Sequence, residues 1–146
     1  MALRLGISAN VIQSFPASLE ARINAAMRAS IARSTRVGRR LTYQNTNKRT
    51  GRTARTVGSQ LIGGGSRVSG HFGSDSDVFE YLERGTPAHV IRPRRAKALY
   101  WPGAAHPVKM VRHPGTRAYR QLERAGKSAG AYAKQDLRIS IGRVLG

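Results

Sequence analysis

The chain has 146 residues, the size of one ordinary domain. It has 26 Lys and Arg against 7 Asp and Glu, a formal net charge of +19, and its lack of cysteine excludes disulfides, cysteine-ligated zinc and thiol catalysis. No apolar run approaches the ~20 residues that a membrane-spanning helix needs, and the N-terminus lacks the apolar stretch of a secretory signal. We therefore expect synthesis in the cytoplasm and no membrane partner.

The first predicted element is an amphipathic helix over residues 17–34. Pro16 suits the start of a helix, and apolar side chains then recur at helical spacing, at Leu19, Ile23, Met27 and Ile31. After this helix the pattern dissolves into Arg, Thr, Asn and Gly. We therefore expect a basic loop or arm over residues 33–56, with a short helical turn after Gly51.

A β-hairpin is predicted next. Residues 57–62 and residues 68–72 each alternate in the manner of a strand, and the glycine-rich run of residues 63–66 supplies the turn. Asp75 or Ser76 then suits the N-cap of a short helix over residues 78–83, which Gly85 closes.

The remaining segment predicts a second hairpin and a C-terminal helix. The second hairpin pairs residues 97–101 with residues 107–112 around a Pro-Gly turn. Residues 117–146 form a C-terminal helical segment that we expect to break near Gly126 and Gly130, although its last apolar residues also suit a strand. The whole chain therefore predicts one α+β domain over residues 1–146, with a small antiparallel sheet of about four strands, a long N-terminal helix and a C-terminal helix.

The positive charge lies on both sides of a small acidic segment. Residues 75–83 carry a net charge of −4, whereas residues 1–74 carry +11 and residues 84–146 carry +12. A chain with this balance gains from an anionic partner. The basic arm supplies six arginines that suit either DNA phosphates or the carboxylates of a protein neighbour, and the sequence leaves both open: Arg36, Arg39, Arg40, Arg49, Arg52 and Arg55.

The sequence has no arrangement of residues typical of catalysis, a metal site or a cofactor site. The four histidines lack the spacing of a metal site. Glu80 and Glu83 have the spacing of an acid–base pair, but we favour a solvated helix face beside Arg84. Aromatic residues make up only 6% of the chain, too few to predict a platform for stacking bases. We expect a protein that is not an enzyme.

One segment has a more specific pattern, in two runs. The first run begins Tyr81-Leu82-Glu83-Arg84-Gly85-Thr86 and continues through His89, Ile91 and Pro93, and an Ala-Leu pair and the run His113-Pro114-Gly115-Thr116 follow it. This ordered set resembles the neck family of tailed bacteriophages, small head–tail joining proteins also labelled tail components or tail-completion proteins. The resemblance covers roughly residues 15–125 and is strongest over residues 79–116. It departs from the family pattern at Arg49 and at residues 117–120.

The resemblance implies a structural virion protein that forms a ring in the neck, joins the DNA-filled head to the tail and lets DNA pass. It implies these partners: further copies in a ring of six or twelve, head-completion or stopper proteins, tail-terminator or tail-tube proteins, and nonspecific DNA in the channel. The residues that would form its interface or turn motif are Tyr81, Glu83, Gly85, Thr86, Pro87, His89, Pro93, His113, Pro114, Gly115 and Thr116. A second class stays open: a free basic nucleic-acid-binding protein, associated with the ribosome or the nucleoid.

Overall fold

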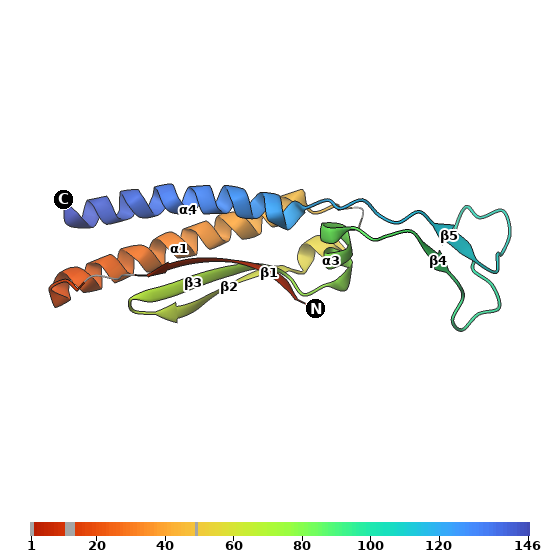
Figure 1. Ribbon diagram of the computed structural model, residues 1–146, viewed down its shortest axis with the longest axis horizontal. Helices are drawn as coiled ribbons and strands as arrows, with labels where there is room; N and C mark the ends of the chain where they lie inside the picture. The colour runs from red at the N-terminus through yellow and green to blue at the C-terminus, as the bar shows by residue number, and fades with distance from the viewer. Residues whose placement is uncertain (1, 11–13, 49) are drawn as a thin grey trace.

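Two long helices lie side by side over one face of a small sheet, and a thin two-stranded ribbon extends beyond one end of this assembly (Figure 1). The structure is a computed structural model, and it describes residues 2–10, 14–48 and 50–146. It confirms the predicted α+β class, with a long N-terminal helix, a C-terminal helix and a small antiparallel sheet. Within the described ranges, the helices are too short or too polar to cross a membrane.

The three-stranded sheet has the order β1-β3-β2, and all its neighbouring strands are antiparallel. Its strands are β1 (Leu3–Asn10), β2 (Val57–Gly64) and β3 (Arg67–Ser74). The β2–β3 hairpin was predicted from the alternation around the glycine turn and is confirmed. Strand β1 was not predicted, because it pairs with β3 some 60 residues away in the chain and so has no hairpin turn that would mark it in the sequence.

Helix α1 (Ala17–Asn45) begins where the sequence predicted but ends eleven residues later than residue 34. The predicted basic loop is therefore wrong over residues 33–45. The inner face of the helix changes along its length from apolar residues to small polar ones, several of which are buried with their hydroxyls bonded to the helix itself. The hydroxyls of Thr35, Thr42 and Thr46 each donate to the backbone carbonyl four residues earlier. The predicted turn after Gly51 is confirmed as the short helix α2 (Arg52–Arg55).

Gly38 shows how closely this face of α1 approaches the sheet. It lies against the ring of Phe72 on β3, where a Cβ atom would overlap the aromatic carbons. Phe72 has no exposed surface and belongs to the main core cluster, together with Val57, Phe79 and Leu122. A glycine within a helical segment usually indicates that the helix ends. Here Gly38 leaves room for the ring of Phe72, one of the two largest residues of the core.

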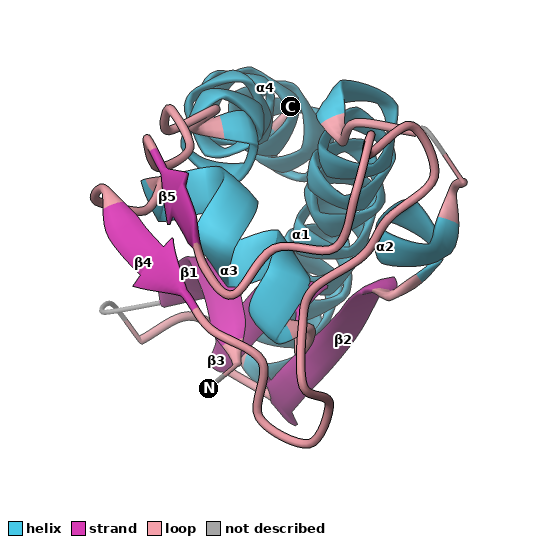
Figure 2. Cartoon of the chain, turned by 90° about the vertical axis from the view of Figure 1, so that its right-hand side faces the viewer, coloured by secondary structure: helices cyan, strands magenta, loops and turns pink. Residues whose placement is uncertain are grey.

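Helix α4 (Gln121–Leu145) is unbroken, so the predicted interruption near Gly126 and Gly130 is wrong. Gly126 lies against β1, where a Cβ atom would overlap the side chain of Leu5. The buried face of α4 is rich in small residues, including Ala125, Ala129 and Ala133, which lets α4 pack closely against α1. Figure 2, which looks along the two helices, shows α1 and α4 as neighbours on the same side of the sheet.

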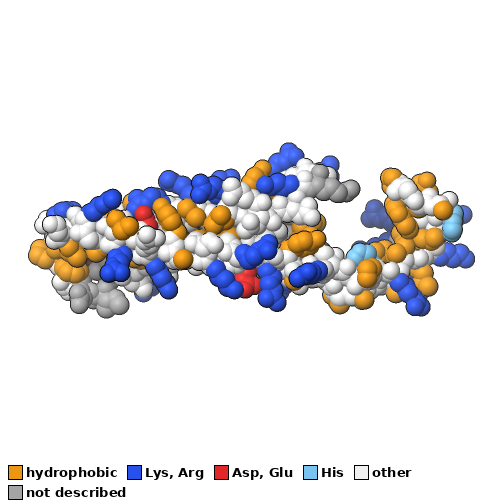
Figure 3. Space-filling view, turned by 90° about the horizontal axis from the view of Figure 1, so that it is seen from above, with side chains coloured by type: hydrophobic (Ala, Val, Ile, Leu, Met, Phe, Trp, Pro, Cys, Tyr) orange, Lys and Arg blue, Asp and Glu red, His pale blue; other side chains and the backbone are white. Residues whose placement is uncertain are grey.

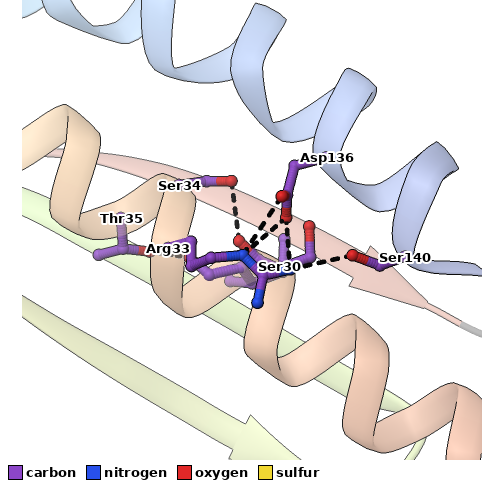
Figure 4. Close-up of polar contacts among 7 residues, drawn as sticks. Ser30, Arg33, Ser34, Thr35, Asp136 and Ser140 are labelled. Atoms are coloured by element: carbon purple, nitrogen blue, oxygen red, sulfur yellow. Dashed lines mark hydrogen bonds and ion pairs between the residues drawn. The ribbon is translucent and has the colours of Figure 1, made fainter.

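An ion pair joins the two long helices near their middle (Figure 4). The guanidinium of Arg33 donates to both carboxylate oxygens of Asp136, at 2.8 and 3.2 Å from Oδ2, and to the hydroxyl of Ser140 at 2.9 Å. The hydrogen bond from Arg33 lowers the pKa of Asp136 against the opposing effect of burial. The pair therefore stabilises the α1–α4 contact while the carboxyl is ionised.

The polypeptide leaves the packed layers after α3 (Asp77–Arg84), which begins after Ser76 and ends at Gly85 as predicted. The second predicted hairpin is only partly correct. Regular pairing joins β4 (His89–Ile91) to β5 (Val111–His113), nearer the helices than expected, and the predicted strands contribute one bridge, between Leu99 and Val108. We call residues 86–118 the ribbon, and the rest of the described chain the body.

Candidate functional site

The two runs of the predicted motif, some 30 residues apart in the sequence, meet at the junction between the body and the ribbon. Thr86 and Thr116 pair through two backbone hydrogen bonds of 2.9 and 3.0 Å. The hydroxyl of Thr86 accepts a further hydrogen bond from the N–H of Thr116 at 3.0 Å. The outgoing and returning strands are thus joined where they leave the body.

Glycine is required on both sides of this pair. Gly85 has a φ of 75° and Gly115 a φ of 91°, a region that other residues rarely adopt. A Cβ on Gly85 would lie 2.5 Å from the carbonyl oxygen of Thr116, and a Cβ on Gly115 would overlap the carbonyl oxygen of Thr86. The Gly-Thr repetition in the two runs therefore has a structural cause: each glycine lets the opposite strand approach.

Glu83 anchors the junction to α4. Its side chain is buried, and its two carboxylate oxygens accept hydrogen bonds from the backbone N–H groups of Leu122 at 2.8 Å and Glu123 at 3.0 Å. These donors belong to the first turn of α4, whose N–H groups have no partner within the helix, so Glu83 caps α4 from another element. The predicted solvated helix face is therefore wrong for Glu83, although Glu80 does form a 3.3 Å ion pair with Arg84.

The other motif residues line the root of the ribbon. The rings of His89 and His113 are cross-strand neighbours with centroids 5.0 Å apart. His89 Nδ1 is 3.0 Å from the carbonyl oxygen of Pro87, and His113 Nδ1 accepts from the N–H of Gly115. Three further motif residues are exposed or half-buried: Tyr81, Pro93 and Pro114. Within the described ranges, His, Asp and Glu side chains form no group of three or more that could hold a metal ion.

The ribbon itself has no buried residue. Five of its large apolar side chains are exposed to solvent, by as much as 67% for Tyr100: Val90, Ile91, Tyr100, Trp101 and Met110. Its seven Lys and Arg residues are also all exposed, and the segment contains no Asp or Glu: Arg92, Arg94, Arg95, Lys97, Lys109, Arg112 and Arg117. Figure 3 shows basic and hydrophobic side chains intermixed on this projecting part of the molecule.

A basic hollow of about 730 Å³ opens where the ribbon returns to the body. The side chains around it come from the last residues of the ribbon and the first turns of α4: Arg117, Ala118, Tyr119, Arg120, Glu123, Arg124 and Lys127. Glu123 is its single carboxylate, and it is paired with Lys127 at 2.8 Å. The hydrogen bond and charge of Lys127, and the charge of Arg120, lower the pKa of Glu123.

The arginines of the predicted basic arm lie elsewhere. Arg36, Arg39 and Arg40 are exposed on α1, and Arg52 and Arg55 are exposed on α2, while Arg49 lies outside the described residues. Two of them bond to backbone carbonyls of the same chain, Arg39 to Val57 and Arg55 to Thr50. Among the described residues, none of these arginines forms an ion pair with a carboxylate of this chain.

The ribbon surface was not predicted from the sequence, because the low overall fraction of aromatic residues gave no sign of their local clustering. Three of the nine aromatic residues gather on the ribbon and beside its base, at Tyr100, Trp101 and Tyr119, and all three are exposed. A local signal was present, since the sequence contains no carboxylate between Glu83 and Glu123. A basic segment that lacks Asp and Glu and has aromatic residues in a Tyr-Trp-Pro-Gly turn is typical of an interaction surface.

Comparison of the chain with protein-family models, with curated proteins and with solved structures gives no match.

Proposed function

We propose that the chain is a structural subunit of a tailed-bacteriophage neck, forming a ring of six or twelve copies between the DNA-filled head and the tail. The resemblance of residues 79–116 to head–tail joining proteins supports this proposal. The geometry gives these residues a common task, because the two runs of the motif build one junction that holds the ribbon away from the body.

One observation carries the proposal: residues 86–118 project from the body without a single buried side chain. An element of this length that exposes Val90, Trp101 and Met110 gains stability when a neighbour covers it. Subunits of a ring have such neighbours on every side. The proposed role requires recognition and passage of DNA and no chemistry.

The experiment is to purify the full chain and measure its mass by native mass spectrometry, with negative-stain electron microscopy of the same sample. We expect a closed ring of six or twelve copies. A variant with Val90→Asp and Met110→Asp should stay folded by circular dichroism, because neither side chain is buried, yet assemble less. A chain that is monomeric at high concentration would contradict the ring and favour the free nucleic-acid-binding protein.

In a phage that encodes this chain, loss of the gene should leave DNA-filled heads and finished tails unjoined. Electron microscopy of the particles gives the answer. Normal virions would contradict the proposed role, and so would empty heads, which indicate an earlier step in DNA packaging.

A further inference from the structure

We propose that the ribbon and the basic hollow at its base form a binding surface for duplex DNA, without sequence preference. This inference goes beyond the proposed ring, because it names a surface that acts in each chain whether or not the chains assemble. It also assigns DNA contact to a part of the molecule different from the arginines of α1 and α2.

The shape of the ribbon fits the grooves of DNA. It is a two-stranded antiparallel element that projects from the body with solvent on its sides (Figures 1 and 3). The major groove of B-DNA, about 12 Å wide, admits a two-stranded ribbon of this kind. The junction at Thr86 and Thr116 holds both strands of the ribbon at its root.

The charges also match a polyanion. Ten Lys and Arg residues lie between residues 85 and 127, seven on the ribbon and three more at the hollow, Arg120, Arg124 and Lys127. The only carboxylate in this segment, Glu123, is already paired with Lys127. Duplex DNA presents about one negative charge per 1.7 Å of its axis, and such a continuous line of phosphates suits cations that extend from a ribbon onto its base.

In a ring, a neighbouring copy can cover apolar side chains of the ribbon, but it offers few carboxylates to match the ribbon's cations. Over the part of the chain that the structure describes, these carboxylates are engaged within the chain by ion pairs or by the cap on α4: Asp75, Glu80, Glu83, Glu123 and Asp136. With a net charge of +19, two copies repel each other wherever no acidic surface intervenes. Exposed Tyr100, Trp101 and Met110 add apolar surface that can contact bases and sugars in a groove.

Nonspecific binding of this kind is compatible with passage of DNA. Contacts to phosphates depend on counterion release and not on base sequence, so a protein can hold a duplex and still slide along it. The ribbon would thus keep DNA near the protein without fixing its position.

The test is fluorescence anisotropy with the full chain and a labelled 30-base-pair duplex of arbitrary sequence, over a series of salt concentrations. The ribbon variant carries Arg94→Ala, Arg95→Ala and Lys97→Ala. The control carries Arg36→Ala, Arg40→Ala and Arg52→Ala, which remove the same charge from exposed positions of α1 and α2. We expect the ribbon variant to lose affinity on the order of 100-fold at 0.1 M salt, and its slope of log K against log salt to fall by about 2 to 3.

The control should change affinity by less than about fivefold, because its arginines lie off the proposed surface. An equal loss in both variants would overturn the inference, since it would show that net charge alone attracts DNA. Absence of binding by the wild-type chain would also overturn it. So would competition by polyglutamate that matches DNA charge for charge, which would indicate an acidic protein as the partner.

The same samples separate this inference from the proposed function. Native mass spectrometry reports the oligomeric state of each variant beside its affinity for DNA. DNA binding through the ribbon without a ring contradicts the neck proposal and supports the inference. A ring whose DNA binding is unaffected by the ribbon variant does the reverse.

Discussion

In the body, Phe72 and Phe79 have no exposed surface, and two long helices close over a three-stranded sheet. The ribbon has 33 residues and no buried side chain. Its two strands are held together by the β4–β5 pairing, the bridge from Leu99 to Val108 and the junction at Thr86 and Thr116. The difference indicates that the body provides the stability of the fold and that the ribbon provides a surface for binding. Substitutions in the body should act on stability, and substitutions in the ribbon should act on binding.

The core provides the largest expected effect. Replacing Phe72 by Ala removes the ring that fills the space beside Gly38 and should lower the free energy of unfolding by about 3 to 5 kcal/mol. Met110→Ala is the matched change in the ribbon and should alter it by less than about 0.5 kcal/mol, because Met110 is exposed. Urea denaturation measures both. Similar losses from the two variants would break the division between body and ribbon.

The junction tests whether the root of the ribbon belongs to the body. Gly85→Ala should destabilise the chain by about 3 kcal/mol, because it combines a strained φ with a Cβ that lies 2.5 Å from the carbonyl oxygen of Thr116. Gly103→Ala is the control: its φ of 94° is equally unusual, but its Cβ would meet no atom within 4 Å. The control has the strain of its φ without the overlap, and should destabilise the chain by about 1 kcal/mol, clearly less than Gly85→Ala. Equal effects would show that backbone strain alone, and not the close approach, decides.

The cap that Glu83 provides on α4 offers a second test of whether the residues at the root of the ribbon stabilise the body. Glu83→Ala leaves the N–H groups of Leu122 and Glu123, the first of them buried, without an acceptor and should cost about 2 kcal/mol. Glu83→Gln keeps one acceptor oxygen and should lose less. Thermal denaturation of the three chains gives the order. A Glu83→Ala chain as stable as the wild type would show that the cap contributes nothing.

The smallest effect concerns the ion pair between the long helices. Asp136→Asn should cost about 1 kcal/mol at pH 7, since Arg33 is partly exposed and screened by solvent. The folded-state pKa of Asp136 is lowered, so the contribution of the pair is complete above the ordinary carboxyl pKa of 3.8 and disappears as the pH falls through the folded value. The difference between variant and wild type should therefore shrink below pH 4. Glu123→Gln, at an exposed pair, serves as the control.

Local patterns in the sequence predicted the start of α1, the β2–β3 hairpin, the limits of α3 and the helix at the C-terminus. They failed where tertiary contacts decide. The second half of α1 is helical because Thr35 and Thr42 satisfy their hydroxyls on the helix itself and Gly38 faces Phe72, and α4 continues through Gly126 because Leu5 packs against it. The hydroxyl bonds are local but polar, and the partners of Gly38 and Gly126 are remote in the sequence, so none of these contacts leaves a periodic apolar pattern.

The candidate site was predicted in part. The motif residues do meet, but as a junction that positions the ribbon, and a spacing argument could not distinguish the buried cap of Glu83 from the surface ion pair of Glu80. The exposure of Tyr100 and Trp101 depends on the ribbon having no layer packed over it, which composition does not reveal.

Hydrogen exchange followed by mass spectrometry tests the division between body and ribbon most directly. In the free chain, amides of residues 86–118 should exchange fast, whereas those of β3 and the middle of α1 and α4 should be protected, because only the latter lie in a closed core. Addition of a 30-base-pair duplex should slow exchange in the ribbon and around residues 117–127 and leave the core unchanged. Protection that appears on α1 and α2 while the ribbon continues to exchange fast would contradict the account.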